Sequence, residues 1–299
     1  MKYFAFAALI VLALSGPAIE LKDSDLVCPQ EMIDEINSIQ DSWTASSEWV
    51  GQMTVAEAKL KASSISRPRE FPEKDWGALI NYFSAPASFD SRQQWPGCVH
   101  PILNQEQCGS CWAFGASEAL SDRLCIATNG TVNVTLSPQY LVSCDSQNYG
   151  CNGGYADLAW RFMKDTGVPT YSCVPYIAAD GTCPTKCADG SALQFYKATS
   201  VNTYSGPSSI QAAILAGGPV EVTFQVYKDF MSYSGGIYKH TKGEFVGNHC
   251  VKIIGWGNQS GTNYWIVANS WGTSWGLQGF FWIAFGQCGI DSQGVAGSA

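Results

Sequence analysis

The spacing of apolar residues along this chain changes from helical to strand-like. Between residues 110 and 128 apolar side chains recur with the period of an α-helix, and Ser110 is a suitable N-cap. Toward the C-terminus the period becomes two, in glycine-punctuated aromatic segments at residues 220–226, 249–256, 263–268 and 279–285. The pattern predicts an α+β fold, with a helical part followed by a sheet or barrel.

The N-terminus has the features of a secretory signal peptide. Lys2 is followed by an apolar stretch at residues 4–14 and by small residues at 15–18. The stretch is too short to span a bilayer, and no other uninterrupted apolar run approaches that length. Sequons begin at Asn129, Asn133 and Asn258. We therefore expect a soluble protein of the secretory pathway, without a membrane span and with sites that permit glycosylation.

Composition excludes some functions and constrains the cysteines. A net charge of -8 with only 17 Lys and Arg argues against nucleic-acid binding, which needs clustered cations. Twelve cysteines in a secreted chain indicate a disulfide framework. Cys28 stands apart in the N-terminal third, and the other eleven are an odd number, so at least one of these eleven has no partner among the rest.

Cys111 is the strongest candidate for a reactive group. It falls in the first turn of the predicted helix, within the sequence CGSCW at residues 108–112. The helix dipole and the unsatisfied N–H groups of a first turn favour an anion, which lowers the pKa of a thiol and makes it nucleophilic. Gln105, six residues earlier, could aim its amide at a developing oxyanion beside the Cys111 N–H.

A base and its orienting partner are predicted from the two strands downstream. If the turn is centred on residues 259–260, residues whose numbers sum to about 518 face one another, so that His249 meets Asn269. A bulge could shift this register by one or two residues. Asn269 could then hold the imidazole in one tautomer, and Trp271 could shield their hydrogen bond from water.

Taken singly, these residues have ordinary structural interpretations, but together they predict a thiol protease. Two alternatives are an inactive relative that only binds peptides, and a zinc or redox protein that uses Cys108 and Cys111. The three histidines do not pair locally with a cysteine motif, so we expect no metal and no cofactor.

The N-terminal third is predicted to be separable, because charge is high up to residue 84 and cysteines and glycines crowd the chain after it. Met32, Ile36 and Ile39 lie on one face of a predicted helix, and a second helix at residues 54–60 opens with a threonine cap. Two helices and an extended tether before a hydrolase indicate an inhibitory pro-segment. The alternative is a small N-terminal domain or a linker.

Five sequence blocks together resemble the papain superfamily of cysteine proteases; they lie at residues 86–92, 105–114, 151–154, 217–220 and 269–272. Residues 112–116, 121–123, 153–155 and 288–290 are more narrowly similar to cathepsin B, as is the short pro-segment. The resemblance implies a full precursor with a signal peptide at 1–18, an inhibitory propeptide at 19–84 and a peptidase domain at 85–299. That domain is expected to have two lobes, a helical one at about 97–195 and an antiparallel β-barrel at about 196–290.

Carried over residue by residue, the resemblance implies Cys111 as nucleophile, His249 as base and then acid, Asn269 as orienter and Gln105 as oxyanion donor. The substrate-binding residues it implies are Gly153, Gly154, Tyr155, Ala156, Thr223, Cys250, Trp271 and Gln293. The disulfides it implies are Cys98–Cys125, Cys108–Cys151, Cys144–Cys183 and Cys173–Cys187.

The partners that the resemblance implies are peptide and protein substrates, the chain's own propeptide, and cystatin-like or E-64-type inhibitors. We expect a monomer, held in a lysosome-like or vacuole-like compartment or secreted.

Three departures from the cathepsin B pattern stand out. Only residues 174–182, without a histidine, separate Cys173 from Cys183, where cathepsin B has a long occluding loop. This predicts endopeptidase action with little carboxydipeptidase activity. Gln293 replaces an acidic group in the pocket for the residue two before the scissile bond, which predicts a preference for hydrophobic side chains over Arg there. Glu106 stands where the family usually has glycine.

Overall fold

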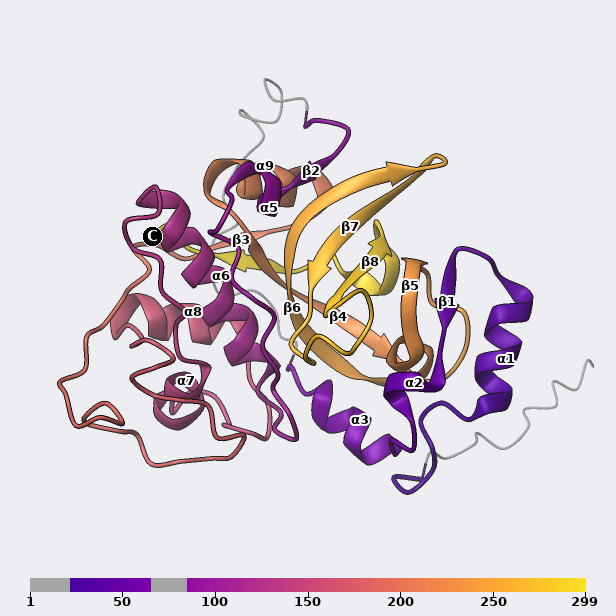
Figure 1. Ribbon diagram of the computed structural model, residues 1–299, viewed down its shortest axis with the longest axis horizontal. Coiled ribbons are helices and arrows are strands. Elements are labelled where there is room, and N and C mark those ends of the chain that lie inside the picture. The colour runs from indigo at the N-terminus through magenta and orange to yellow at the C-terminus, as the bar shows by residue number, and fades with distance from the viewer. Residues whose placement is uncertain (1–21, 66–84) are drawn as a thin grey trace, which may run out of the picture.

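The computed structural model of this protein describes residues 22–65 and 85–299. The predicted signal peptide, the tether after residue 65 and the expected junction near residue 84 lie outside these residues. The described chain forms a helical lobe and a β lobe side by side, with the N-terminal segment laid along the β lobe (Figure 1). No helix in the described ranges is long and apolar enough to cross a membrane.

The helical lobe is built around α6 (Cys111–Ala127), which follows Ser110 as the sequence predicts. Fifteen of its seventeen residues are buried, because α7 (Pro138–Cys144) and α8 (Ala156–Asp165) pack on it from one lobe and the sheet packs on it from the other. The Ser110 hydroxyl makes no capping bond; it lies 2.7 Å from the hydroxyl of Tyr176 instead. α6 therefore forms part of the interface between the lobes.

The β lobe contains a nine-stranded sheet. Its strands are β1 (Trp43–Ala45), β2 (Phe89–Asp90), β3 (Asn202–Tyr204), β4 (Val220–Tyr227), β5 (Tyr233–Tyr238), β6 (Phe245–Gln259), β7 (Thr262–Ala268), β8 (Phe280–Ala284) and β9 (Gly294–Ala296). Helix α9 (Pro207–Gly217) and the short α5 (Ser91–Gln94) lie outside it.

The expected antiparallel barrel is wrong in two respects. In the part of the chain that the structure describes, the sheet runs from β1 to β3 in the order β1-β5-β8-β7-β6-β4-β9-β3, and these two end strands do not pair. The sheet is therefore open. In addition, β5 and β8 are parallel neighbours. The alternating pattern identified β4, β6, β7 and β8 but not the shorter strands or β5, and it does not contain the long-range pairing that decides closure.

The β6–β7 hairpin is shifted relative to the predicted register. Its tight turn is formed by Ser260 and Gly261, both with positive φ. The numbers of paired residues near the turn therefore sum to 521, as for Gln259 and Thr262. A bulge then shifts the pairing by one, and the ladder ends at Lys252 and Ala268. His249 consequently has no ladder partner on β7.

The N-terminal segment folds as the two predicted helices, with a strand and a short helix between them that were not predicted. α1 (Gln30–Ile39) buries Ile33 and Ile36, whereas Ile39, expected on the buried face, is 59% exposed. α3 (Val55–Lys61) opens with the predicted capping box between Thr54 and Glu57.

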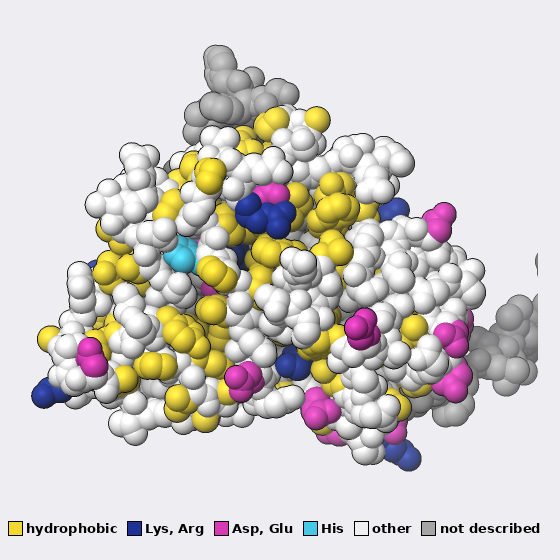
Figure 2. All heavy atoms as spheres, in the orientation of Figure 1, with side chains coloured by type: hydrophobic (Ala, Val, Ile, Leu, Met, Phe, Trp, Pro, Cys, Tyr) yellow, Lys and Arg dark blue, Asp and Glu magenta, His cyan; other side chains and the backbone are white. Residues whose placement is uncertain are grey.

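This segment joins the sheet of the β lobe. β1 pairs antiparallel with β5, and α2 (Ser47–Val50) and α3 continue along the same side toward the boundary between the lobes (Figure 1). On the face seen in Figure 2, acidic side chains gather mainly over this segment. Edge-strand pairing of this kind gives affinity through main-chain hydrogen bonds.

Four disulfides stabilise the helical lobe, and they are the four pairs that the resemblance implies. They join Cys98 to Cys125, Cys108 to Cys151, Cys144 to Cys183 and Cys173 to Cys187. The free thiols are those of Cys28, Cys111, Cys250 and Cys288. Cys108 is therefore not bonded to Cys111, which argues against a redox function for this pair.

Candidate active site

Cys111 is the first residue of α6 and is fully buried at the boundary between the lobes. The loop before it is held by the Cys108–Cys151 disulfide and by a hydrogen bond of 2.9 Å from the Gly109 N–H to the Cys151 carbonyl. Residue 109 must be small, because a Cβ there would lie 2.4 Å from that carbonyl oxygen. These constraints fix the start of the helix and hence the sulfur.

His249 and Asn269 meet across the β lobe. Nε2 of His249 lies 2.7 Å from Oδ1 of Asn269, which also accepts a hydrogen bond of 2.8 Å from the Ser270 N–H. The indole of Trp271 stacks on the imidazole with ring centroids 4.8 Å apart. All of these side chains are buried. Because Nε2 is committed to Asn269, Nδ1 is the ring nitrogen available to the Cys111 sulfur.

The surroundings of Cys111 favour its thiolate. Burial raises the pKa of the thiol, but hydrogen bonding to Cys250 and His249 and the charge of the His249 ring outweigh it. The pKa of Cys111 is therefore well below its usual value. In the same cluster, burial raises the pKa of the Cys250 thiol, so that Cys250 remains protonated and can donate to Cys111.

Gln105 is fully buried and oriented by both lobes. Its Oε1 accepts a hydrogen bond of 2.8 Å from the Ser270 hydroxyl, and its backbone N–H donates to the Ser270 carbonyl. The side-chain amide donates to the Cys108 carbonyl at 3.0 Å and to the Lys61 carbonyl of the N-terminal segment at 3.3 Å. The amide that was predicted to bind an oxyanion thus already faces a carbonyl oxygen.

The N-terminal segment runs through the cleft beside these residues. The Ser64 N–H donates to the Asn248 carbonyl and the Ile65 N–H to the Gly154 carbonyl, both at 2.8 Å. Gly153 has φ of 106° and approaches Ser63 closely: a Cβ at position 153 would lie 2.2 Å from the Ser63 carbonyl oxygen. Gly153 and Gly154 therefore form one wall of the cleft, and residues 63–65 occupy it.

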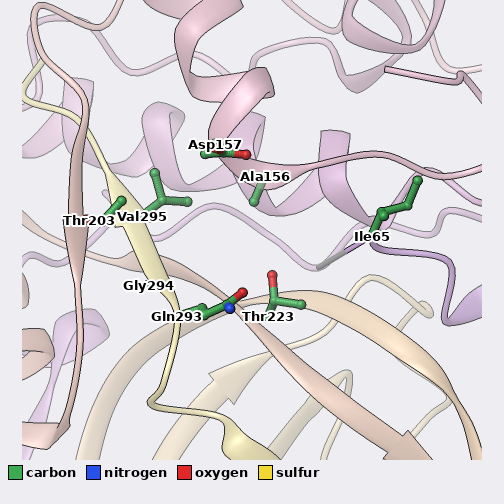
Figure 3. A pocket seen from close by; sticks show the side chains of 8 residues that line it. All are labelled: Ile65, Ala156, Asp157, Thr203, Thr223, Gln293, Gly294 and Val295. Atoms are coloured by element: carbon green, nitrogen blue, oxygen red, sulfur yellow. The ribbon is translucent and has the colours of Figure 1, made fainter. Parts of the chain in front are cut away.

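A pocket lies at the Ile65 end of this cleft. Figure 3 shows Ala156 and Asp157 reaching it from the start of α8, and Thr223 and Gln293 from the β lobe. Ala156, Thr223 and Gln293 were predicted to line a substrate pocket. Two other predicted residues are not among those lining it: Tyr155 packs near the ring of Tyr149, and the Cys250 sulfur contacts the Ser64 and Thr223 hydroxyls.

Sequence reasoning missed several residues of the site. Ser270 holds Gln105, and Asp157 and Thr203 line the pocket. Glu221 is fully buried under the site, where its carboxylate accepts a hydrogen bond of 2.8 Å from the Trp160 indole. Burial raises the pKa of Glu221 well above its usual value. The sequence did offer a signal for Glu221, since a charged residue within the largely apolar segment 220–226 is unusual.

Within residues 22–65 and 85–299 no group of three or more His, Cys, Asp or Glu side chains could hold a metal ion.

Residues 85–298 match the model of the papain family of cysteine proteases, and the chain therefore belongs to this family. It is a cysteine peptidase with a papain-like α+β fold. Among its relatives, the cathepsin B-like CP3 of Giardia intestinalis is 39% identical over 99% of both chains. The gut-specific cysteine proteinase of Caenorhabditis elegans is 40% identical over 100% of this chain and 99% of its own.

The structural neighbours include proforms. The structure of procathepsin B S9 from Trypanosoma congolense has a TM-score of 0.87 at 30% identity, and covers 92% of this chain and 99% of its own. That of procathepsin L2 from Tenebrio molitor has a TM-score of 0.78 at 32% identity, and covers 90% of each chain. The chain is thus a cathepsin B-like protease in its zymogen form, with the propeptide in the cleft.

Proposed function

We propose that this protein is an endopeptidase in which Cys111 is the nucleophile and His249 the proton carrier, while Asn269 orients the imidazole and Gln105 stabilises the oxyanion. The observation that carries the proposal is the buried arrangement of a low-pKa thiol at a helix N-terminus opposite an imidazole fixed at 2.7 Å by an amide oxygen. Such an arrangement is what nucleophilic catalysis by a thiolate requires.

The reaction follows from the positions of these atoms. The Cys111 thiolate attacks the carbonyl carbon of a peptide bond, and the oxyanion forms near the Gln105 amide and the Cys111 N–H. The His249 imidazolium gives its proton to the leaving amine, which leaves a thioester on Cys111. Water then loses a proton to His249 and attacks the thioester. The carboxylic acid leaves and the ion pair is restored.

Residues 19–84 act in this proposal as the inhibitory propeptide, and cleavage near residue 84 releases the peptidase domain of residues 85–299. Support comes from the backbone of residues 63–65, which occupies the cleft between Asn248 and Gly154. Processing is tested by acid treatment of the purified precursor followed by N-terminal sequencing. A new N-terminus far inside residues 85–299 would contradict the assigned boundary.

The primed side of the cleft is proposed to be open, so that internal bonds are cut and dipeptides are not removed from C-termini. The segment 174–182 is short and has no histidine to bind a terminal carboxylate. The test compares a peptide with a blocked amine and a free C-terminus with the same peptide amidated. Release of dipeptides from the free acid as fast as internal cleavage would refute this specificity.

The pocket beside Ile65 is proposed to receive the residue two before the scissile bond, with a preference for Leu or Val over Arg. Gln293 provides an uncharged amide there, and Ile65 of the proposed propeptide lines the same pocket. Asp157 also reaches the pocket, so the comparison of Leu, Val and Arg substrates should include the variant Asp157→Asn. A preference for Arg that depends on Asp157 would replace the proposed one.

The catalytic assignment is tested by stoichiometric labelling of the activated enzyme with an epoxide of the E-64 type. Labelling at Cys111 with parallel loss of peptidase activity supports it, and Cys250→Ala is the matched control because its thiol lies in the same cluster. Retention of activity in Cys111→Ser would refute it.

We further propose inhibition by cystatin-like proteins, a monomeric state, a signal peptide at residues 1–18, and a lysosome-like or secreted location.

A further inference from the structure

Lys61, at the end of α3, places a buried ammonium group at the edge of the catalytic cleft. Its side chain is only 5% exposed, and Nζ donates a hydrogen bond of 3.0 Å to the backbone carbonyl of Glu106. The same ammonium lies 5.6 Å from the ring centroid of Trp49. Trp49 in turn stacks on Trp271, with centroids 5.5 Å apart and planes 10° from parallel.

The direction of the propeptide tells which side of the cleft this is. Ile65 lines the pocket that Gln293 also lines, Ser63 lies against Gly109 and Gly153, and the Lys61 carbonyl faces the Gln105 amide. The chain therefore passes from the pocket, over the start of α6, to Lys61. If the pocket receives residues before the scissile bond, the Lys61 side chain occupies the side that receives residues after it.

Glu106 offers a cation two groups, its backbone carbonyl and its exposed carboxylate. The residue has φ of 51°, a conformation that favours glycine, and its N–H is bound at 3.0 Å by the Asn104 side chain. A bulky charged residue is thus kept where glycine would fit with less strain. Its side chain is exposed. Burial lowers the pKa of Lys61 to about 8, and the charges of Glu57 and then Glu106 oppose this effect.

Resting on the proposed function, we propose that the activated enzyme prefers a Lys or Arg side chain on the residue directly after the scissile bond. Once the propeptide leaves, the Trp271 face that Trp49 covers becomes available to the substrate. A cation entering there meets an aromatic face on one side and the carbonyl and carboxylate of Glu106 on the other. Both interactions favour a cation over an uncharged side chain of equal length.

The test uses internally quenched peptides that differ only in the residue after the scissile bond, with Lys compared with Gln and Arg compared with Met. The measured quantity is the ratio of kcat/KM within each pair, which cancels the general activity of a preparation. For the activated enzyme we expect a ratio of about 5, the effect of one partly exposed charge pair with a cation–π contact. Raising the salt concentration should lower this ratio.

Two variants, Glu106→Gln and Glu106→Gly, remove the charge. Glycine also removes the backbone strain of the positive φ, so the second variant should keep the fold even if the first does not. Both should lower the ratio, because they remove the carboxylate but keep the backbone carbonyl of residue 106 and the Trp271 face. The matched control, Asp165→Asn, removes an exposed carboxylate remote from the cleft and should leave the ratio unchanged. A ratio of one in the unmodified enzyme, or a ratio that Glu106→Gly leaves unchanged, overturns the proposal. Absence of all cleavage by the activated enzyme would instead refute the proposed function.

Discussion

Nε2 of His249 and Oδ1 of Asn269 lie 2.7 Å apart although the two residues are not paired in the β6–β7 ladder. The ladder stops at Lys252 and Ala268, and the Asn269 N–H turns away to bond the Gly279 carbonyl. The amide side chain reaches the imidazole only because the chain leaves the sheet at this point. The orientation of the His249 ring therefore depends on the side chain of Asn269 rather than on strand pairing.

Replacing Asn269 by Ala should lower kcat/KM by about 10-fold to 100-fold, because the imidazole keeps its chemistry but loses its fixed orientation. The measurement is kcat/KM of the activated enzyme, corrected for active sites by titration with an epoxide inhibitor. Asn263→Ala, on the exposed part of β7, is the control and should have little effect. Full activity in Asn269→Ala would mean that Trp271 stacking alone orients the ring.

Gln105→Ala should lower kcat by about 100-fold to 1,000-fold with a small change in KM, since an oxyanion donor acts mainly in the transition state. The Ser270 hydroxyl that binds Gln105 can turn to another acceptor, so the fold should persist. Gln107→Ala changes an exposed neighbour of the same type and serves as control. A loss seen mainly in KM would show that Gln105 binds substrate instead.

Trp49→Ala should loosen the propeptide in the intact precursor. Trp49 covers Trp271 and is the kind of aromatic anchor whose truncation costs about 2 kcal/mol, or about 30-fold in the open population. The readout is the rate at which an epoxide labels Cys111 in the unprocessed precursor at neutral pH. Ile39→Ala removes an exposed side chain of the same segment and should not change this rate. Equal labelling in both variants would show that Trp49 does not keep the cleft closed.

Glu118 makes stability depend on pH. Burial raises its pKa from 4.5 to about 7, although Lys252 lowers it in part. A carboxyl with a raised pKa contributes stability that is fully present below pH 4.5 and is lost as the pH rises to about 7. The loss can reach about 3 kcal/mol, since each pKa unit corresponds to about 1.4 kcal/mol.

Glu118→Gln stays uncharged at every pH and should remove this dependence. The measured quantity is the free energy of unfolding in urea. The difference between the variant and the unmodified precursor should favour the variant more at pH 7.5 than at pH 4.5. Glu31→Gln, at an exposed position on α1, provides the comparison. The same effect of Glu118→Gln at both pH values would contradict the assignment.

Local features were predictable from the sequence, and long-range pairing was not. Helix α6 was expected at residues 110–128 and is found at Cys111–Ala127, because apolar spacing and capping are local signals. The same holds for the capping box at Thr54. In contrast, β1 is only three residues long, and its identity as a strand depends on β5 nearly two hundred residues away.

The site shows the same division. Cys111, His249, Asn269 and Gln105 were predicted because their residue types and spacing are specific, whereas Ser270 and Asp157 are common residues that only their positions in the fold bring to the site. The register error in the hairpin did not separate His249 from Asn269, because the bond is made beyond the end of the ladder. The departure at Glu106 was visible in the sequence. The contact between Lys61 and the Glu106 carbonyl, on which the proposed role of Glu106 rests, was visible only in the structure.

The main-chain bonds that Ser64 and Ile65 make to Asn248 and Gly154 have a consequence for what this enzyme can digest. The cleft walls offer carbonyl groups to the amides of a visiting chain, and a chain whose amides are already used within a helix or a sheet has none to offer in return. Native proteins should therefore be cut first at tails and surface loops. Denatured material, such as acid-unfolded protein, should be degraded throughout its length.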